Sequence, residues 1–399
     1  MYLKSLSKEI SFPSKIVLLR LDLNVPMNEK REIEDETRII NSLPTIQYLL
    51  DHYTKIIIIS HFGRPNGIYQ KKYSLYPIYK RLKELLVGND IYFSDKKIGT
   101  KELKRTIFNL EDKEILFLEN IRFYPEEEEN NIEFSKELSS LGDIYINDAF
   151  GTCHRKHSST YGILSFIKYK CLGFLIEKEL YYLKENIRPP VFAIIGGSKI
   201  STKITLLKSL LEKVDTIFIG GAMVFTFLAA RGISTGKSLI EKDEIDTAKE
   251  IESYAKKKGV ELVLPIDFRI VKDIKQPNTL EITMDQTIPK DWIGIDQGSL
   301  SDDLLEKKIL EKKSTVLWNG PLGIFEIEEY SKGTNSLLKV LSKLPKEQNT
   351  ILGGGDTLSA VKKLGFQKED FTHLSTGGGS SLKLLEGDNL PCISIFEKK

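Results

Sequence analysis

The stretch Val-Phe-Ala-Ile-Ile-Gly-Gly at residues 191–197 sets a pattern that governs the second half of the chain: an aliphatic run that ends abruptly in glycine. Continuous apolar runs bounded by turn residues are typical of buried parallel strands. Helical stretches follow most of these runs, as at Ala222–Ala230. The pattern therefore predicts a parallel sheet with glycine turns along one edge. It recurs at 216–221, 315–321, 350–356 and 373–379.

The first half of the chain has the same alternation with polar residues in place of glycines. Amphipathic stretches such as Leu75–Leu86 lie between the apolar runs, and strands that alternate with helices favour a doubly wound sheet. We therefore expect the α/β class, with two doubly wound parallel-sheet (Rossmann-like) domains and a cleft between them. The apolar runs are Ile16–Leu21, Ile56–Ile59, Ile115–Leu118 and Ile144–Ile146.

The length of 399 residues also favours two domains. Phe174–Lys184 has helical periodicity and is followed by Arg188-Pro189-Pro190, so we interpret it as a linking helix, although an ordinary helix inside one domain would have the same pattern. The predicted division is an N-terminal domain over 1–173, a linking segment over 174–190, a C-terminal domain over 191–380, and a segment over 381–399 that returns to the first domain.

Composition excludes several classes of protein. A net charge of +2 shows no general affinity for polyanions, so we expect no nucleic-acid partner. The N-terminus has no apolar core of a signal peptide, and the run at Lys55–Ile59 is far too short to cross a bilayer. Three cysteines without a CxxC pair favour a reduced, cytoplasmic protein without structural disulfides or zinc.

The glycine turns predict a rim that binds phosphates, because glycine lets backbone N–H groups approach oxygens closely and helix N-termini favour anions. Lys199 and Lys203 are spaced i, i+4 at the start of a helix expected over Ile200–Val214. They would share one helix face and bind an anion, or be two solvated lysines. Asp356 follows three glycines and is either a helix N-cap or a Mg²⁺ ligand.

A second set of polar residues follows the strands of the first half. At one sheet edge they would surround a small, highly anionic substrate, although each alone could form a structural salt bridge. Arginine is a minority among the 58 Lys+Arg residues, which suggests that its planar bidentate geometry is used at particular sites. The set is Asp22, Asn24, His61, Arg64, Arg122 and Arg155.

Other patterns point to weaker alternatives. Gly232–Ser238 is not a Walker A loop, because three residues separate its glycines where four are required. No GxGxxG follows a strand, which argues against a dehydrogenase. His154 and His157 have no third ligand suitably spaced for zinc. The acidic run Glu126–Glu129 is interpreted as a solvated loop or helix start. A non-catalytic nucleotide-binding protein remains the other alternative.

Taken together, these motifs resemble those of phosphoglycerate kinases over essentially the whole chain. Each motif is moderately specific alone, and their order and separations make the resemblance strong. The segments that carry it are Arg20–Pro26, His61–Pro65, Leu118–Phe123, Asn147–Thr152, Trp318–Pro321, Gly353–Thr357 and Ser375–Gly379.

The resemblance implies reversible phosphoryl transfer between 1,3-bisphosphoglycerate and Mg-ADP, giving 3-phosphoglycerate and ATP after domain closure. It also implies a cytoplasmic monomer of glycolysis without a membrane partner. Phosphoglycerate would be held by Asp22, Asn24, Arg38, His61, Arg64, Arg122 and Arg155. The catalytic groups would be Arg38, Lys199, Gly377 and Gly378. The nucleotide would contact Gly197, Lys203, Gly221, Gly294, Asn319, Glu326, Gly354, Gly355, Asp356 and Thr357, with Asp356 on Mg²⁺.

The sequence departs from the family pattern at three positions. Cys153 and Lys156 stand where small residues are common, and Ala222 replaces a third glycine after Gly220-Gly221. These residues border the expected sites, so they put substrate affinity in doubt rather than activity.

Overall fold

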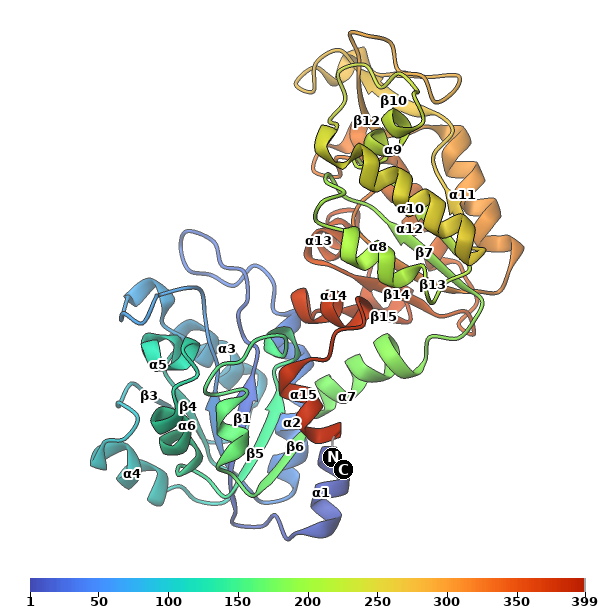
Figure 1. Cartoon of the computed structure of the whole chain (residues 1–399). Coiled ribbons are helices and arrows are strands. Elements are labelled where there is room, and N and C mark those ends of the chain that lie inside the picture. The colour runs from blue at the N-terminus through green and yellow to red at the C-terminus, as the bar shows by residue number, and fades with distance from the viewer. Residues whose placement is uncertain (398–399) are drawn as a thin grey trace. The chain divides into compact units, whose positions relative to one another are not determined.

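The computed structural model describes residues 1–397 and divides into two compact units, which are described separately (Figure 1). Unit 1 contains Met1–Tyr181 and the C-terminal segment from Asn389, and unit 2 contains Tyr182–Asp388. The segment 381–388, expected to return to the first domain, belongs to unit 2 in this division. The limits predicted at 173, 190 and 380 stay predictions.

Unit 1 is built on a six-stranded parallel sheet with the strand order β3-β4-β2-β1-β5-β6. The strands are β1 (Ile16–Leu21), β2 (Lys55–Ile59), β3 (Ile91–Ser94), β4 (Ile115–Leu118), β5 (Ile144–Asp148) and β6 (Tyr169–Leu172). The helices are α1 (Leu3–Glu9), α2 (Thr37–Asp51), α3 (Tyr76–Leu85), α4 (Lys101–Phe108), α5 (Pro125–Glu128), α6 (Ile132–Ser139), α7 (Phe174–Leu180) and α15 (Pro391–Glu397).

Alternate residues of the unit 1 strands feed two separate cores. Val17 and Leu19 of β1 pack in one cluster with residues of α1, α2 and α3, whereas Leu18 packs in another with residues of α4 and α6. Successive side chains of a strand point to opposite faces, so both faces of this sheet are covered by helices. Asn131 caps α6 by accepting a hydrogen bond from Phe134 N at 3.0 Å.

Unit 2 repeats this plan with the order β15-β14-β13-β7-β8-β9, again all parallel. The strands are β7 (Val191–Ile195), β8 (Thr216–Ile219), β9 (Glu261–Val263), β13 (Thr315–Asn319), β14 (Thr350–Gly353) and β15 (His373–Ser375). The helices are α8 (Ile204–Leu210), α9 (Val224–Ala230), α10 (Ile245–Lys258), α11 (Ser299–Glu311), α12 (Lys332–Ser342), α13 (Gly355–Lys363) and α14 (Gly379–Leu385).

A small antiparallel sheet, not expected from the sequence, adds to unit 2. It has the order β11-β10-β12, with β10 at Phe268–Val271, β11 at Glu281–Ile282 and β12 at Ile293–Gln297. The pairing of β10 with β12 shifts register between Arg269 and Ile270. This sheet supplies one wall of the cavity described below.

The predicted α/β fold class is confirmed, since each unit is built on a doubly wound parallel sheet. The helix predicted over Phe174–Lys184 is observed as α7, which is followed by a π-helical turn at Tyr181–Glu185, and its role as a link stays a prediction. The helix expected over Ile200–Val214 is wrong in its limits, because α8 spans only Ile204–Leu210. No helix in the described part of the chain is long and apolar enough to cross a membrane.

Candidate active site

The strand order of unit 1 reverses between β1 and β5, which are neighbours in the sheet although they are distant in sequence. Loops that leave two such strands separate at the sheet edge, and ligands of open α/β sheets bind there. Asp22 follows β1 directly, and Gly151 lies in the loop after β5, where an added Cβ would collide with the Asp22 carboxylate. The Asp22 side chain therefore fills the space beside Gly151, between the two loops.

Asp22 contacts two of the predicted substrate-binding residues, Arg38 and His61. The Arg38 guanidinium, from the first turn of α2, donates from Nη1 to Asp22 Oδ2 at 2.6 Å. His61, two residues beyond β2, places Nδ1 3.9 Å from Asp22 Oδ1 and 3.3 Å from Arg20 Nη2. Burial, together with the charges of Arg20 and Arg122, holds the pKa of His61 well below its usual range, so this imidazole is neutral at pH 7.

Arg122 is the most unusual cation of this cluster. Its side chain is 3 % exposed, and Nη1 donates to Gly63 O at 2.7 Å. Its Nε and Nη2 are buried without a hydrogen-bond partner among the described residues, and Nε lies 3.4 Å from Glu128 Oε1. Burial lowers the pKa of Arg122 to about 10, against the attraction of Glu128. Unpaired buried guanidinium donors are costly, and a bound anion would relieve the cost.

The remaining predicted residues of unit 1 lie in less enclosed positions. Arg155 is half-buried, donates from Nε to His154 Nε2 at 3.1 Å, and lies close enough to Arg122 to lower its pKa. Asn24 accepts a hydrogen bond from Gly63 N at 2.9 Å, which joins the loops after β1 and β2. Arg64 is exposed, and no contact joins it to the cluster in the described structure.

A buried layer behind these cations was missed by the sequence analysis. Arg20 is fully buried and donates from Nε to Ser159 Oγ at 2.8 Å, and Ser159 donates through N and Oγ to the two carboxylate oxygens of Glu127 at 2.8 and 2.6 Å. The interpretation of Glu126–Glu129 as a solvated segment is therefore wrong for Glu127, which is fully buried. The run consists of four glutamates, so the sequence could not indicate that the side chain of Glu127 alone is buried.

In unit 2 the strand order reverses between β7 and β13. The turns that leave these strands pack backbone against backbone: a Cβ on Gly196 would collide with the carbonyls of Gly320 and Pro321, and one on Gly320 would collide with Gly196. Gly221, with φ of +69°, lies against Gly197 in the same way. Only glycine permits this approach, so the glycine turns do assemble at one edge of the sheet.

The two lysines of this edge do not share a helix face, and that prediction is wrong. Lys199 is exposed in the loop after β7, and Lys203 is the residue before α8. The chain needs residues 201–203 for a turn after Gly197, whose φ is +134°, so the helix begins later than its apolar pattern suggests. Lys203 donates from Nζ to Asn319 Oδ1, and burial lowers its pKa against the attraction of Asp356.

Four predicted residues follow β14: Gly354, Gly355, Asp356 and Thr357. Gly354 has φ of +97° and precedes α13, so the N-cap of that helix is Gly354 and the N-cap alternative for Asp356 is wrong. Asp356 is exposed in the first turn of α13. Thr357 is buried and accepts from Gly320 N at 2.8 Å, and Asn319 Nδ2 donates to Gly353 O at 3.0 Å. The loops after β13 and β14 are thus joined by side chains.

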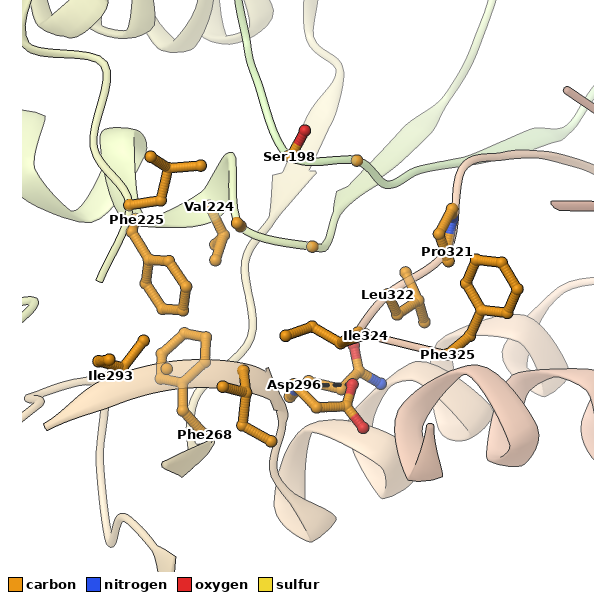
Figure 2. Close-up of a pocket in the computed structure, with 18 of the residues that line it drawn as sticks. Ser198, Val224, Phe225, Phe268, Ile293, Asp296, Pro321, Leu322, Ile324 and Phe325 are labelled. Carbon is orange, nitrogen blue, oxygen red and sulfur yellow. Dashed lines mark hydrogen bonds between the residues drawn. The ribbon is translucent and has the colours of Figure 1, made fainter. Parts of the chain in front are cut away.

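A cavity of about 400 Å³ opens beside these turns and is largely apolar (Figure 2). Phe225 of α9 and Phe268 of β10 pack against each other in its lining, with ring centroids 5.2 Å apart and ring planes inclined by 54°. Five predicted residues line it: Gly197, Gly221, Gly294, Glu326 and Asp356. The sequence analysis did not predict this aromatic pair. Phe225 lies in a helix that was expected, but its partner Phe268 lies in the small sheet, which was not.

Gly377 and Gly378 follow β15 and precede α14. Gly377 N donates to Ser375 Oγ at 3.3 Å, and Gly378 has φ of +51° and ψ of −113°. Ser375 and Ser381 share a buried hydrogen bond of 2.5 Å that holds this loop against α14.

The residues of unit 2 fit a Mg²⁺ ion that is held mainly by phosphates. No group of three or more His, Cys, Asp or Glu side chains in residues 1–397 could enclose a metal. Asp356 and Glu326 are exposed carboxylates that line the cavity, and Asp356 is the one in the first turn of α13. Mg²⁺ commonly takes one or two protein carboxylates and completes its shell with substrate phosphates and water.

A doubly wound sheet with a cation cluster at its switch point, and a second with a glycine-lined cavity at its own, define a two-unit α/β enzyme of the nucleotide-dependent phosphotransferase class. The family model for "Phosphoglycerate kinase" matches residues 7–388. The chain belongs to that family. It catalyses reversible phosphoryl transfer between 1,3-bisphosphoglycerate and ADP, a step of glycolysis.

Individual relatives agree along the full length. The chain is 45 % identical over 401 residues to "Phosphoglycerate kinase" of Prochlorococcus marinus (strain MIT 9515), covering 99 % of this chain and 98 % of the relative. It is similar to the solved structure of phosphoglycerate kinase from Coxiella burnetii, with a TM-score of 0.87, 35 % identity and 98 % coverage of both chains. The Pyrococcus horikoshii structure gives a TM-score of 0.77 at 28 % identity, again with 98 % coverage of both chains.

Proposed function

We propose that the cation cluster of unit 1 binds the phosphoglycerate and that the cavity of unit 2 binds the nucleotide. The observation that carries the first half is the buried Arg122, whose Nε and Nη2 atoms have no hydrogen-bond partner among the described residues. A phosphate or carboxylate oxygen is their natural acceptor. Arg38 and Arg155 would add further bidentate donors, while His61 and Asn24 would donate or accept without charge.

In unit 2, the apolar cavity has the size and lining of a site for a planar base. Gly197, Gly221 and Gly294 would lie against the base, and Glu326 would accept hydrogen bonds from the ribose. Lys203, Asn319 and Thr357 would hold the phosphates with the amides of Gly354 and Gly355. Asp356 would hold Mg²⁺, which supplies charge neutralisation between the phosphates when bound.

The chemistry needs positioned cations rather than a base. The acceptor in the direction of ATP consumption is a carboxylate, whose ordinary pKa is about 4, so it is already ionised at pH 7. His61 and His157 are neutral there, the pKa of His157 being lowered by burial to about 3. Arg38, Lys199 and the amides of Gly377 and Gly378 would stabilise the charge of the migrating phosphoryl group.

Because the two half-sites belong to separate units, transfer would follow closure of one unit on the other, in line between donor and acceptor. Closure also keeps water from the acyl phosphate. We further propose that the protein acts as a cytoplasmic monomer.

A coupled assay with 3-phosphoglycerate and Mg-ATP tests the assignment. We expect ADP to form only when 3-phosphoglycerate is present and only with a divalent cation. Titration of each substrate alone, followed by calorimetry, would separate the half-sites, since Arg122→Ala should abolish phosphoglycerate binding and leave ADP binding unchanged. Loss of ADP binding in that variant would contradict the division of roles.

A further inference from the structure

Two of the three cysteines, from opposite ends of the chain, meet inside unit 1. Cys153 lies in the loop after β5, between Gly151 and Arg155, and Cys392 lies in the first turn of α15. Cys392 N donates to Cys153 O at 3.4 Å, and Cys392 Sγ donates to Arg155 O at 3.2 Å. The C-terminal helix is therefore fastened to the loop that carries Arg155 through both cysteines.

The two thiols also interact with each other. Both residues are fully buried, and burial followed by the hydrogen bond with the Cys392 thiol raises the pKa of Cys153 well above its usual range. A backbone hydrogen bond between two cysteines brings their Cα atoms close to the separations that disulfides span, about 4.4–6.8 Å. To form the bond, each thiol must leave its carbonyl acceptor, which is Ala149 O for Cys153 Sγ and Arg155 O for Cys392 Sγ.

We propose that Cys153 and Cys392 are a redox modification site, which forms a reversible disulfide between the C-terminal helix and the Gly151–Arg155 loop. The oxidant would be a low-molecular-weight disulfide. One cysteine thiolate attacks it, giving a mixed disulfide and releasing one thiol; the second cysteine thiolate then attacks the mixed disulfide and releases the other. Two protein thiols and one external disulfide become one protein disulfide and two external thiols.

Access to the buried sulfur atoms would come from opening of α15. This helix has seven residues, and a helix this short is marginally stable once its packing contacts are lost. Release of α15 exposes Cys392 and uncovers Cys153, and docking of the helix then brings the second thiol to the mixed disulfide. The raised pKa of the Cys153 thiol and the burial of both thiols make the reaction slow in the closed state.

The covalent bond would act on the chain topology. The chain leaves unit 1 after Tyr181 and re-enters it at Asn389, so a Cys153–Cys392 bond closes a loop that contains all of unit 2. It would also prevent α15 from leaving the Arg155 loop. We expect slower hydrogen exchange of the amides at 392–396 in the oxidised protein, and recovery after reduction with dithiothreitol.

Peptide mapping of the full-length protein after incubation with glutathione disulfide tests the proposal. We expect a Cys153–Cys392 cross-linked peptide in the wild type and in Cys171→Ser, whose cysteine lies in β6 beside Ile146 of β5. The cross-link must be absent from Cys153→Ser and from Cys392→Ser. Recovery of the wild type with free thiols, with glutathione adducts alone, or with a bond to Cys171 would overturn the proposal, and none of these outcomes depends on the assigned catalytic roles.

Discussion

The side chains at the edge of the unit 1 sheet gain their chemistry from burial as much as from residue type. Arg20 and Arg122 are buried close to each other, a costly arrangement that the buried Glu127 carboxylate partly offsets. The pKa of Glu127 is raised by burial, and its hydrogen bonds from Ser159 oppose the rise. Positive charge thus collects at one edge of a protein whose net charge is only +2.

Replacement of Arg38 by alanine tests the catalytic assignment. We expect turnover to fall about a hundredfold to a thousandfold, because a charge that stabilises the transferring group is lost. The dissociation constant for ADP, measured by calorimetry, should not change. Arg81→Ala is the matched control, since Arg81 pairs with Glu36 at 2.6 Å on the surface of the same unit. Normal turnover in Arg38→Ala would reject its catalytic role.

Glu127→Gln tests the buried layer. The neutral amide keeps the shape but has one acceptor oxygen for the two hydrogen bonds from Ser159, so we expect a loss of about 1–3 kcal/mol of unfolding free energy. Urea denaturation followed by circular dichroism measures it. Glu129→Gln, at an exposed position two residues away, should change stability by less than about 0.5 kcal/mol. Equal effects of the two changes would rule out the structural role of Glu127.

At the scale of elements, the turns after β7, β13 and β14 form one structure. Lys203 donates a hydrogen bond to Asn319, Asn319 donates one to Gly353, and Thr357 accepts one from the backbone N–H of Gly320. These hydrogen bonds hold the three turns in fixed positions relative to one another, so a ligand that binds one turn would lie next to the others. This linkage explains why residues widely separated in sequence line the same edge.

Lys203→Met tests this edge. The thioether keeps most of the apolar length of the lysine but removes the charge, so we expect affinity for ADP to fall about tenfold to a hundredfold. Lys208→Met is the control, because Lys208 lies at the exposed surface of α8 and pairs loosely with Glu250 at 3.8 Å. Calorimetric titration with ADP measures both variants. Unaltered affinity in Lys203→Met would remove it from the phosphate site.

Over the whole molecule, each unit buries one aspartate with a strongly altered acidity. Burial raises the pKa of Asp148 in unit 1 and of Asp296 in unit 2 to about 7 from the ordinary 3.8. Between pH 4 and 7 the folded protein keeps protons that the unfolded chain has released, so these groups make stability fall as the pH rises. Above pH 7 both carboxyl groups are ionised in the folded protein, and the free energy of unfolding is lowered by the full cost of burying their charges.

Asp296→Asn isolates this effect in unit 2. We expect the difference in urea midpoint between pH 5 and pH 8 to be smaller in the variant than in the wild type, because the proton linkage of one group is removed. The variant should have about the stability of the wild type at pH 5, since the protonated Asp296 and the amide each have one carbonyl oxygen for the two donors, Gly333 N and Gln297 N. An equal pH dependence in the two proteins would show that Asp296 is ionised in the folded state at pH 5.

Local sequence determined the strands and their polar ends, because an aliphatic run followed by glycine or Asp/Asn has few alternatives to a buried parallel strand. The runs at Ile16–Leu21 and Val191–Ile195 coincide with β1 and β7. The resemblance also identified the family. Candidate residues such as Asp22 and Asn319 could be named in this way, since they follow strand ends.

Only the tertiary structure decided the start of α8, the inward turn of Glu127, the pairing of Phe225 with Phe268, and the meeting of Cys153 with Cys392. Each depends on a partner that is distant in sequence. The turn before α8 begins at the Gly196–Gly320 contact, and Glu127 is bound by Ser159. Phe268 comes from the small sheet, and Cys392 comes from α15. A pattern read along the chain measures apolar periodicity within a segment. It contains no information on which distant segment will supply the partner, because that is settled by packing of the whole unit.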